Sequence, residues 1–183
     1  PNREKTELRV TPPQLVTVSA EPFVSPPLFN AKTGGWLRGA RLSALKAQET
    51  TTPHLLEPAS LVLRTGADLN SPALAMGEDY DADLIWGTVG RLPNGRIKEG
   101  QPVYASYRYA PLRLDAVVLT RGGDIVLRTG EPRAAAPLPP RIEESEQHLG
   151  NIWLPGWLAK LGPENLFAIS EDAFPESPKT QPA

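Results

Sequence analysis

Residues 101–130 read QPVYASYRYAPLRLDAVVLTRGGDIVLRTG, and this stretch decides the fold class. Its first run, VYASYRY, alternates between side chains suited to a core and side chains suited to solvent, as an extended strand does. LRLDAVVLT and DIVLRTG are two further runs of β type, and the Gly122-Gly123 pair between them is typical of a hairpin turn. These runs predict a meander of antiparallel strands. In the first run, alternation assigns Val103, Ala105, Tyr107 and Tyr109 to one face and Tyr104, Ser106 and Arg108 to the other.

The remainder of the chain also favours strands. QLVTVSAEPFV (14–24), ASLVLRTG (59–66) and ALAMGEDYDADLIWGTVGRL (73–92) are β-type runs, whereas WLRGARLSALKAQET (36–50) fits either a strand or one short helix, with the strand preferred. The 21 prolines divide the chain into short elements, because proline suits neither helix interiors nor central strands. We therefore predict a mostly-β fold, an antiparallel β-sandwich or compact barrel with a loop-rich C-terminal extension.

Composition divides the chain into four segments. Residues 1–12 are expected to be disordered or a linker, and residues 13–135 to form the β-sandwich domain. Residues 136–174 read as an extended proline-rich connector followed by a packed segment that contains Trp153 and Trp157. Residues 175–183, PESPKTQPA, have the composition of a linker tail. This arrangement indicates one module of a longer protein.

Charge and residue usage exclude several classes of function. The formal charge of −2 and the scattered basic residues predict no nucleic-acid partner. No run of 18 apolar residues is present, so no membrane insertion is expected. The chain has no cysteine, only two histidines and no G-x-S-x-G motif, so neither a cofactor nor a catalytic residue is predicted.

The stretch EDYDADLIWGTVG (78–90) raises the possibility of a calcium loop, because Asp79, Asp81 and Asp83 alternate. An EF-hand loop that starts at Asp79 would need glycine at its sixth position and glutamate at its twelfth, where this chain has Leu84 and Gly90. Alternate residues of a strand also lie roughly 6–7 Å apart, too far for one ion. We predict no metal site here; the three aspartates are expected to form a solvated turn and an acidic strand edge.

Aromatic side chains on a sheet surface can stack on sugar rings, although tryptophan more often packs in cores. Tyr104 is the best-placed candidate, since alternation puts it on the face opposite Tyr107 and Tyr109. Together with Trp86 and Arg108 it forms our predicted ligand-binding set, and polysaccharide is the ligand considered. The arginines at positions 38, 41, 64 and 128 are expected on a solvated face.

The stretch ALAMGEDYDADLIWGTVGRLPNGRIKEGQPVYASYRY (73–109) resembles the β-rich accessory region that precedes SGNH/GDSL-type esterase domains in modular bacterial proteins. The segment from APLPP through HLGNIWLPGWLAKLGPENLFAI (136–169) is similar to the join into such a domain. The likeness covers residues 74–169 and consists of turn and strand patterns. The first stretch also resembles β-domains of phage tail and baseplate proteins. The G-D-S block of the esterase family has no match here, so no catalytic residue carries over.

The resemblance implies a non-catalytic N-terminal accessory or binding module of a larger SGNH-type hydrolase. Such a module would position or cap a linked catalytic domain, would contact carbohydrate, and would be secreted or periplasmic. The alternative is a structural protein–protein interaction domain of a phage tail or baseplate-like assembly. An enzyme in its own right ranks third, because the chain lacks a local catalytic motif.

Overall fold

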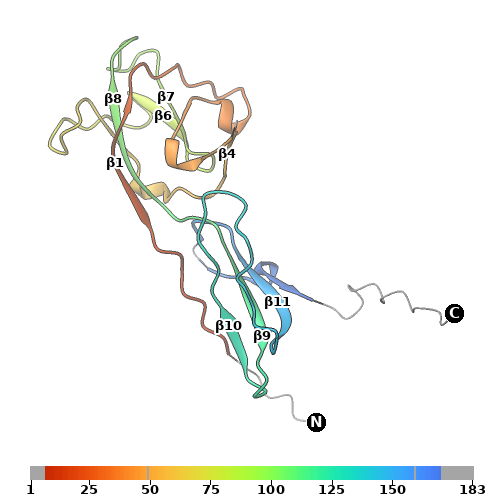
Figure 1. Cartoon of the computed structure of the whole chain (residues 1–183). Coiled ribbons are helices and arrows are strands. Elements are labelled where there is room, and N and C mark those ends of the chain that lie inside the picture. The colour runs from red at the N-terminus through yellow and green to blue at the C-terminus, as the bar shows by residue number, and fades with distance from the viewer. Residues whose placement is uncertain (1–6, 49, 159, 170–183) are drawn as a thin grey trace.

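The computed structural model describes residues 7–48, 50–158 and 160–169, and strands dominate this part of the chain (Figure 1). Within the described residues, twelve strands form four antiparallel sheets, and the helical content is limited to four 3₁₀ turns of three residues each. The predicted mostly-β class with a loop-rich C-terminal region is confirmed. The predicted tail at 175–183 lies outside the described residues, as do the first six residues of the chain.

Two small sheets enclose the main core in the part of the molecule at the top of Figure 1. One has the strand order β1–β8–β5 and the other β2–β7–β6, while β3 and β4 form a separate pair. Both three-stranded sheets contribute side chains to a single buried cluster, so they pack as two layers. The strands are β1 (Val16–Phe23), β2 (Ala40–Arg41), β3 (Lys46–Ala47), β4 (Thr50–Thr51), β5 (Val62–Arg64), β6 (Tyr80–Asp83), β7 (Thr88–Arg91) and β8 (Val103–Tyr109).

Strand β8 supplies the centre of this core. Val103, Ala105 and Tyr107, which alternation assigns to one face, are at most 2% exposed and share a cluster with Leu63 of β5 and Val89 of β7. Burying each of the larger apolar side chains contributes about 1.5–3 kcal/mol. The face of β8 that carries Tyr104, Ser106 and Arg108 is therefore left pointing away from the core.

The chain enters β9 without reversing direction. Strand β8 pairs with β1 and β5 but not with β9, so the predicted continuous meander is wrong; of the three runs within residues 101–130, the last two, β9 and β10, form a hairpin. The linker Ala110-Pro111-Leu112 contains no residue pair that favours a two-residue hairpin turn, and β8 and β9 instead run one after the other down the molecule (Figure 1). Segment 36–50 also differs from both alternatives, because it forms the very short strands β2 and β3 with a 3₁₀ turn at Ser43–Leu45 between them.

A second sheet, with the order β10–β9–β11–β12, occupies the lower part of Figure 1. Strand β11 comes from the C-terminal segment and pairs with β9 along its whole length. Arg113 and Asp115 of β9 form an ion pair that is buried inside this part, and Arg113 also donates to the carbonyl of Thr11 in the extended N-terminal segment. The strands are β9 (Arg113–Leu119), β10 (Ile125–Arg128), β11 (Gln147–Leu154) and β12 (Leu166–Ala168).

The junction between the two parts is tightly packed around Gly156. The backbone N–H of Trp157 donates to the His54 carbonyl, and Ala110 donates to Leu55. Gly156 has a φ of +100°, and a Cβ atom there would lie 2.6 Å from the His54 oxygen and 3.1 Å from the Ala110 oxygen. The close approach of three chain segments therefore requires glycine at this position.

Candidate functional site

The outer face of the β1–β8–β5 sheet presents three rows of polar and aromatic side chains. The cross-strand register places Thr17 opposite Arg108, and Val62 opposite Ser106. Tyr104 lies between Pro22 of β1 and Arg64 of β5, as the partner of both. Because alternate residues of β8 point to the core, these rows face outward.

A shallow open hollow of about 370 Å³ lies over this face. The loop between β5 and β6 contributes its exposed Leu69 to one side. Hydroxyl groups and guanidinium groups dominate the polar lining, which is formed by Thr17, Ser19, Ser60, Arg64, Ser106 and Arg108.

An irregularity in β1 shapes the floor of the hollow. The register between β1 and β8 shifts between Val18 and Glu21, and Ala20 has a φ of +53°. The Ala20 N–H donates to the Ser106 hydroxyl at 3.1 Å, which holds the bulge against β8. Bulges of this kind turn side chains away from the regular ladder. The hydroxyls of Thr17 and Ser19 make no hydrogen bond within the described part of the chain, so they are available to a ligand.

Of the two arginines that line the hollow, Arg108 is paired with a carboxylate and Arg64, within the described part of the chain, is not. The Nε of Arg108 donates to the Glu57 carboxylate at 2.5 Å, and the Arg108 backbone N–H donates to the Ser60 hydroxyl at 2.8 Å. Glu57 therefore neutralises Arg108 and fixes its position. Arg64 is half-buried and has neither an ion-pair nor a hydrogen-bond partner among the described residues.

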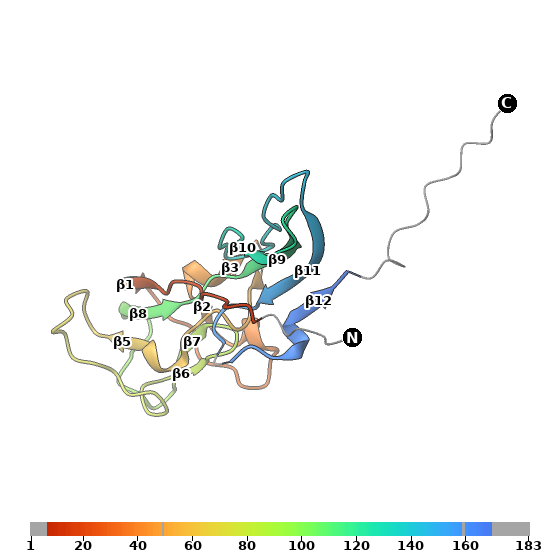
Figure 2. The ribbon, with the colours of Figure 1, turned by 90° about the horizontal axis from the view of Figure 1, so that it is seen from below.

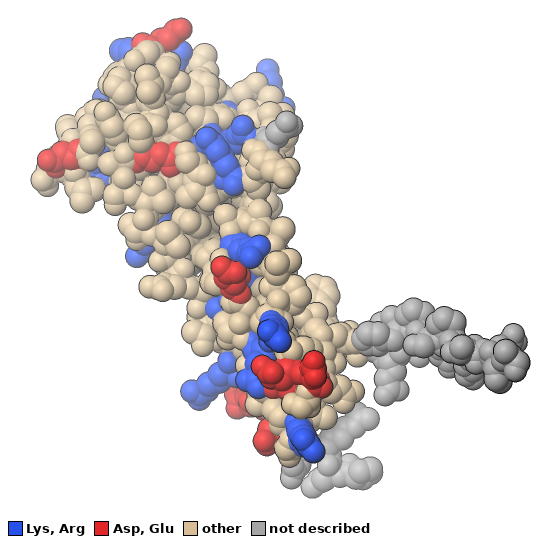
Figure 3. All heavy atoms as spheres, viewed as in Figure 1, with Lys and Arg blue, Asp and Glu red and all other residues tan. Residues whose placement is uncertain are grey.

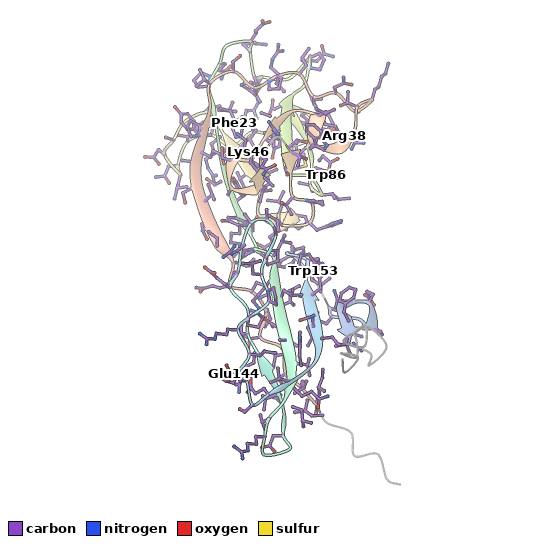
Figure 4. All side chains as sticks on the ribbon, turned by 45° about the vertical axis from the view of Figure 1, so that its right-hand side comes forward. Phe23, Arg38, Lys46, Trp86, Glu144 and Trp153 are labelled. Carbon is purple, nitrogen blue, oxygen red and sulfur yellow. The ribbon has the colours of Figure 1, made fainter. Side chains whose placement is uncertain are left out.

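The structure brings together two members of the predicted ligand-binding set. Tyr104 and Arg108 share the outer face of β8, whereas Trp86 belongs to the turn between β6 and β7 in the other sheet. Trp86 packs on Gly35, where a Cβ atom would overlap its ring, and Figure 4 shows it in the same region as Arg38. Trp86 thus packs against Gly35 beside the β2–β7–β6 sheet and does not line the hollow.

The sequence did not predict the residues that β1 and β5 contribute to the hollow, and it placed four arginines on one face that the structure separates. The alternation of VYASYRY already puts Ser106 beside Tyr104, but the contributions of β1 and β5 depend on pairing between distant segments. The four arginines expected on one solvated face lie in different surroundings. Arg38 pairs with Asp83, Arg128 pairs with Glu146, Arg41 lies 5.8 Å from the Trp36 ring centroid, and Arg64 lines the hollow.

The three alternating aspartates all accept hydrogen bonds from nearby groups of the chain. Asp79 accepts hydrogen bonds from Arg96 and from the backbone N–H of Ala75, and Asp83 pairs with Arg38 while it accepts the N–H groups of Ile85 and Trp86. The Arg96 hydrogen bond holds the pKa of Asp79 well below its usual value. The expected solvated turn is wrong, because Asp79 is only 2% exposed and Asp83 is also buried. Within the described residues, no group of three or more candidate ligands could hold a metal ion.

The two histidines lie in separate environments. His54 is exposed at the junction, with a φ of +63°, and its carbonyl accepts the Trp157 N–H. His148 is on β11, and its Nε2 lies 3.0 Å from both the Gly150 carbonyl oxygen and the Asn151 Oδ1. The two imidazole rings therefore lie in different parts of the fold and share no site.

None of the helical turns in the described ranges is long and apolar enough to cross a membrane. A scan against protein-family models and searches of curated proteins and of solved structures found no match to this chain.

Proposed function

We propose that this chain is a non-catalytic binding module whose outer β1–β8–β5 face holds a saccharide. The observation that carries the proposal is the outer face itself, where the unengaged hydroxyls of Thr17 and Ser19 and the Arg64 guanidinium line a hollow, and Tyr104 lies beside that hollow as the cross-strand partner of Arg64. Sugar recognition uses this combination, because an aromatic ring packs on the apolar face of a pyranose while hydroxyl and guanidinium groups bond its oxygens. The open shape suits a chain that passes across the sheet.

The larger setting of the module rests on the resemblance of residues 74–169 to accessory regions of SGNH-type hydrolases. In that setting the module is secreted or periplasmic, and it holds polysaccharide near a linked ester hydrolase. The binding face is a property of this chain and can be tested without the hydrolase.

The test is a pull-down of the purified chain with insoluble polysaccharides, followed by titration calorimetry with soluble fragments of any polymer that binds. Tyr104→Ala is expected to weaken binding at least tenfold. Phe167→Ala, which removes an exposed aromatic side chain from β12 in the other part of the molecule, is the matched control and is expected to leave binding unchanged. No binding to any polymer, or equal binding by the Tyr104 variant, contradicts the proposal.

A second candidate, a structural unit of a phage-like assembly, is favoured by the exposed edge at β12. Leu166 and Phe167 are 53% and 55% exposed on this edge strand, which lies at the margin of the molecule (Figure 2). Unprotected apolar edges pair readily with another strand, and the partner proposed here is a second copy of the chain. Light scattering that shows a monomer at 100 μM, unchanged by Phe167→Lys, would exclude this second function.

A further inference from the structure

We propose that the ligand of the outer β1–β8–β5 face is an acidic saccharide whose oxyanion binds the Arg64 guanidinium. This inference rests on the proposed saccharide site and adds the chemical class of the ligand. The geometry that carries it is the position of Arg64 directly across from Tyr104, so that one ligand can reach both the ring and the charge.

Arg64 stands apart from the other arginines of the upper part. Among the described arginines from residue 38 to residue 108, Arg38, Arg91, Arg96 and Arg108 each pair with a carboxylate, and Arg41 lies near the Trp36 ring. Elsewhere in the described chain, the arginines that form no ion pair, at positions 9, 121 and 141, are exposed to solvent. Among the arginines that the structure describes, Arg64 alone combines a half-buried position with a side chain that has no partner.

A half-buried charge without a counter-charge is costly, since it gives up part of its hydration without a replacement bond. An incoming carboxylate, sulfate or phosphate group restores that loss through charge-assisted hydrogen bonds from the planar guanidinium group. The unengaged hydroxyls of Thr17 and Ser19 across the sheet can bond the oxygens of the adjoining sugar.

The small positive charge of this face also argues against a densely charged ligand such as nucleic acid. Glu57 already neutralises Arg108, so Arg64 is the one uncompensated cation among the residues that line the hollow. Nucleic-acid binding depends on many phosphate contacts, whereas the visible surface in Figure 3 shows acidic and basic side chains interspersed. A single cation beside an aromatic ring fits a ligand with isolated anionic groups along a polyhydroxylated chain.

The experiment compares two polymer pairs that differ in charge alone. Polygalacturonate is paired with the same polymer after reduction of its carboxylates to alcohols, and lightly sulfated dextran is paired with dextran. Binding is measured by affinity electrophoresis at low and moderate salt. The wild-type chain is expected to bind at least one acidic polymer about tenfold more tightly than its neutral counterpart, and the responding pair identifies the oxyanion.

Arg64→Gln is expected to abolish this preference and to leave binding to the neutral polymer unchanged. Arg121→Gln is the matched control, because it removes the same charge from an exposed position in the turn between β9 and β10. Neither variant is expected to lower the thermal unfolding temperature, since the Arg64 side chain makes no internal bond among the described residues and Arg121 is exposed.

The possible outcomes separate the two proposals. Equal binding of acidic and neutral polymers, or an Arg64→Gln effect no larger than that of Arg121→Gln, overturns the oxyanion inference and leaves the saccharide site in place. Absence of binding to all four polymers and to the polysaccharides of the pull-down overturns the saccharide site itself.

Discussion

Arg96 clasps the buried carboxylate of Asp79 through two nitrogens, with Nε 2.9 Å from Oδ1 and Nη2 2.6 Å from Oδ2. The Arg96 side chain is mostly exposed, whereas the Asp79 carboxylate is buried, so Arg96 covers the carboxylate from the solvent side. The backbone N–H groups of Ala75 and Arg96 complete the set of donors to the carboxylate. The pair therefore joins the β7–β8 connection to the start of β6.

The first prediction concerns acid stability. Because the Arg96 hydrogen bond lowers the pKa of Asp79 below the value of 3.8 that applies in the unfolded chain, the carboxylate stabilises the fold above that value and loses its contribution as pH falls. Asp79→Asn is expected to lower the free energy of unfolding at pH 7 by about 2 kcal/mol. It should also flatten the decline of that free energy between pH 5 and pH 2.

Urea unfolding across this pH range measures both effects. Asp81→Asn is the control, because among the described residues the Asp81 side chain accepts a hydrogen bond only from the adjacent Ala82 N–H. If the Asp79 variant loses stability with falling pH as steeply as the wild type, the proposed role of the pair is wrong.

The second prediction concerns the buried hydroxyl of Tyr107. It donates to Glu21 Oε2 at 2.7 Å and accepts the Ala44 N–H at 3.2 Å, which joins β1, β8 and the 3₁₀ turn at Ser43–Leu45. Burial raises the pKa of Tyr107, and the hydrogen bond to Glu21 raises it further. Above pH 10 the unfolded tyrosine ionises while the folded one keeps its proton, so the free energy of unfolding falls as pH rises.

Tyr107→Phe is expected to cost about 1 kcal/mol at neutral pH and to reduce the alkaline decline. Guanidinium unfolding at pH 7 and between pH 9.5 and pH 11 checks this. At neutral pH, Tyr104→Phe serves as the control, since the Tyr104 hydroxyl makes no hydrogen bond in the described structure. An unchanged alkaline slope for Tyr107→Phe would count against the buried network.

Local patterns in the sequence predicted much of this face. Alternation in VYASYRY correctly separated the core side of β8 from the side that carries Tyr104 and Arg108, because a strand has only two faces. The same pattern holds no information on what lies beside β8. Its neighbours β1 and β5 begin about 90 and 40 residues earlier in the chain, and their pairing assembled the hollow.

The misjudged residues share a physical cause. Asp79 and Asp83 read as surface residues because a charged side chain is rarely buried without a partner, and their partners Arg96 and Arg38 are 17 and 45 residues away. The packing of Trp86 on Gly35 is equally remote in sequence, so the sequence did not reveal that Trp86 lies apart from Tyr104 and Arg108. The distinctive feature of Arg64, a side chain without a partner among the described residues, depends on where every nearby carboxylate lies in the fold, and the sequence does not show this.

The third prediction concerns the junction glycine. Gly156→Ala combines a positive φ with atomic overlap at the His54 and Ala110 carbonyl oxygens, and it is expected to destabilise the fold by about 3 kcal/mol or more. Gly100→Ala has a similar φ of +74° but open space around it, so it measures the backbone strain alone, about 1 kcal/mol. Gly122→Ala has ordinary contacts and no positive φ, and it serves as the neutral control. Thermal unfolding of the three variants should follow this order; equal effects at positions 156 and 100 would show that the junction is loosely packed.

The last prediction concerns the ion pair in the lower sheet. Asp115 is fully buried and accepts hydrogen bonds from Arg113 Nε and Nη2, both at 2.8 Å, and from the Gly130 N–H at 2.9 Å. Asp115→Ala leaves the Arg113 charge buried without a counter-charge, which is expected to cost about 3–5 kcal/mol. Arg113→Met in turn leaves the Asp115 carboxylate buried without a counter-charge, and it should lower the free energy of unfolding by a similar amount.

The double variant Arg113→Met/Asp115→Leu removes both charges and fills the space with apolar atoms. Because desolvation offsets much of the attraction within a buried pair, the double variant is expected to be more stable than either single variant. A double-mutant cycle from urea unfolding measures the coupling directly. A double variant as unstable as the sum of the two single variants would show that the residues act independently, and that Gly130 and Thr11 rather than the pair hold the loops against β9.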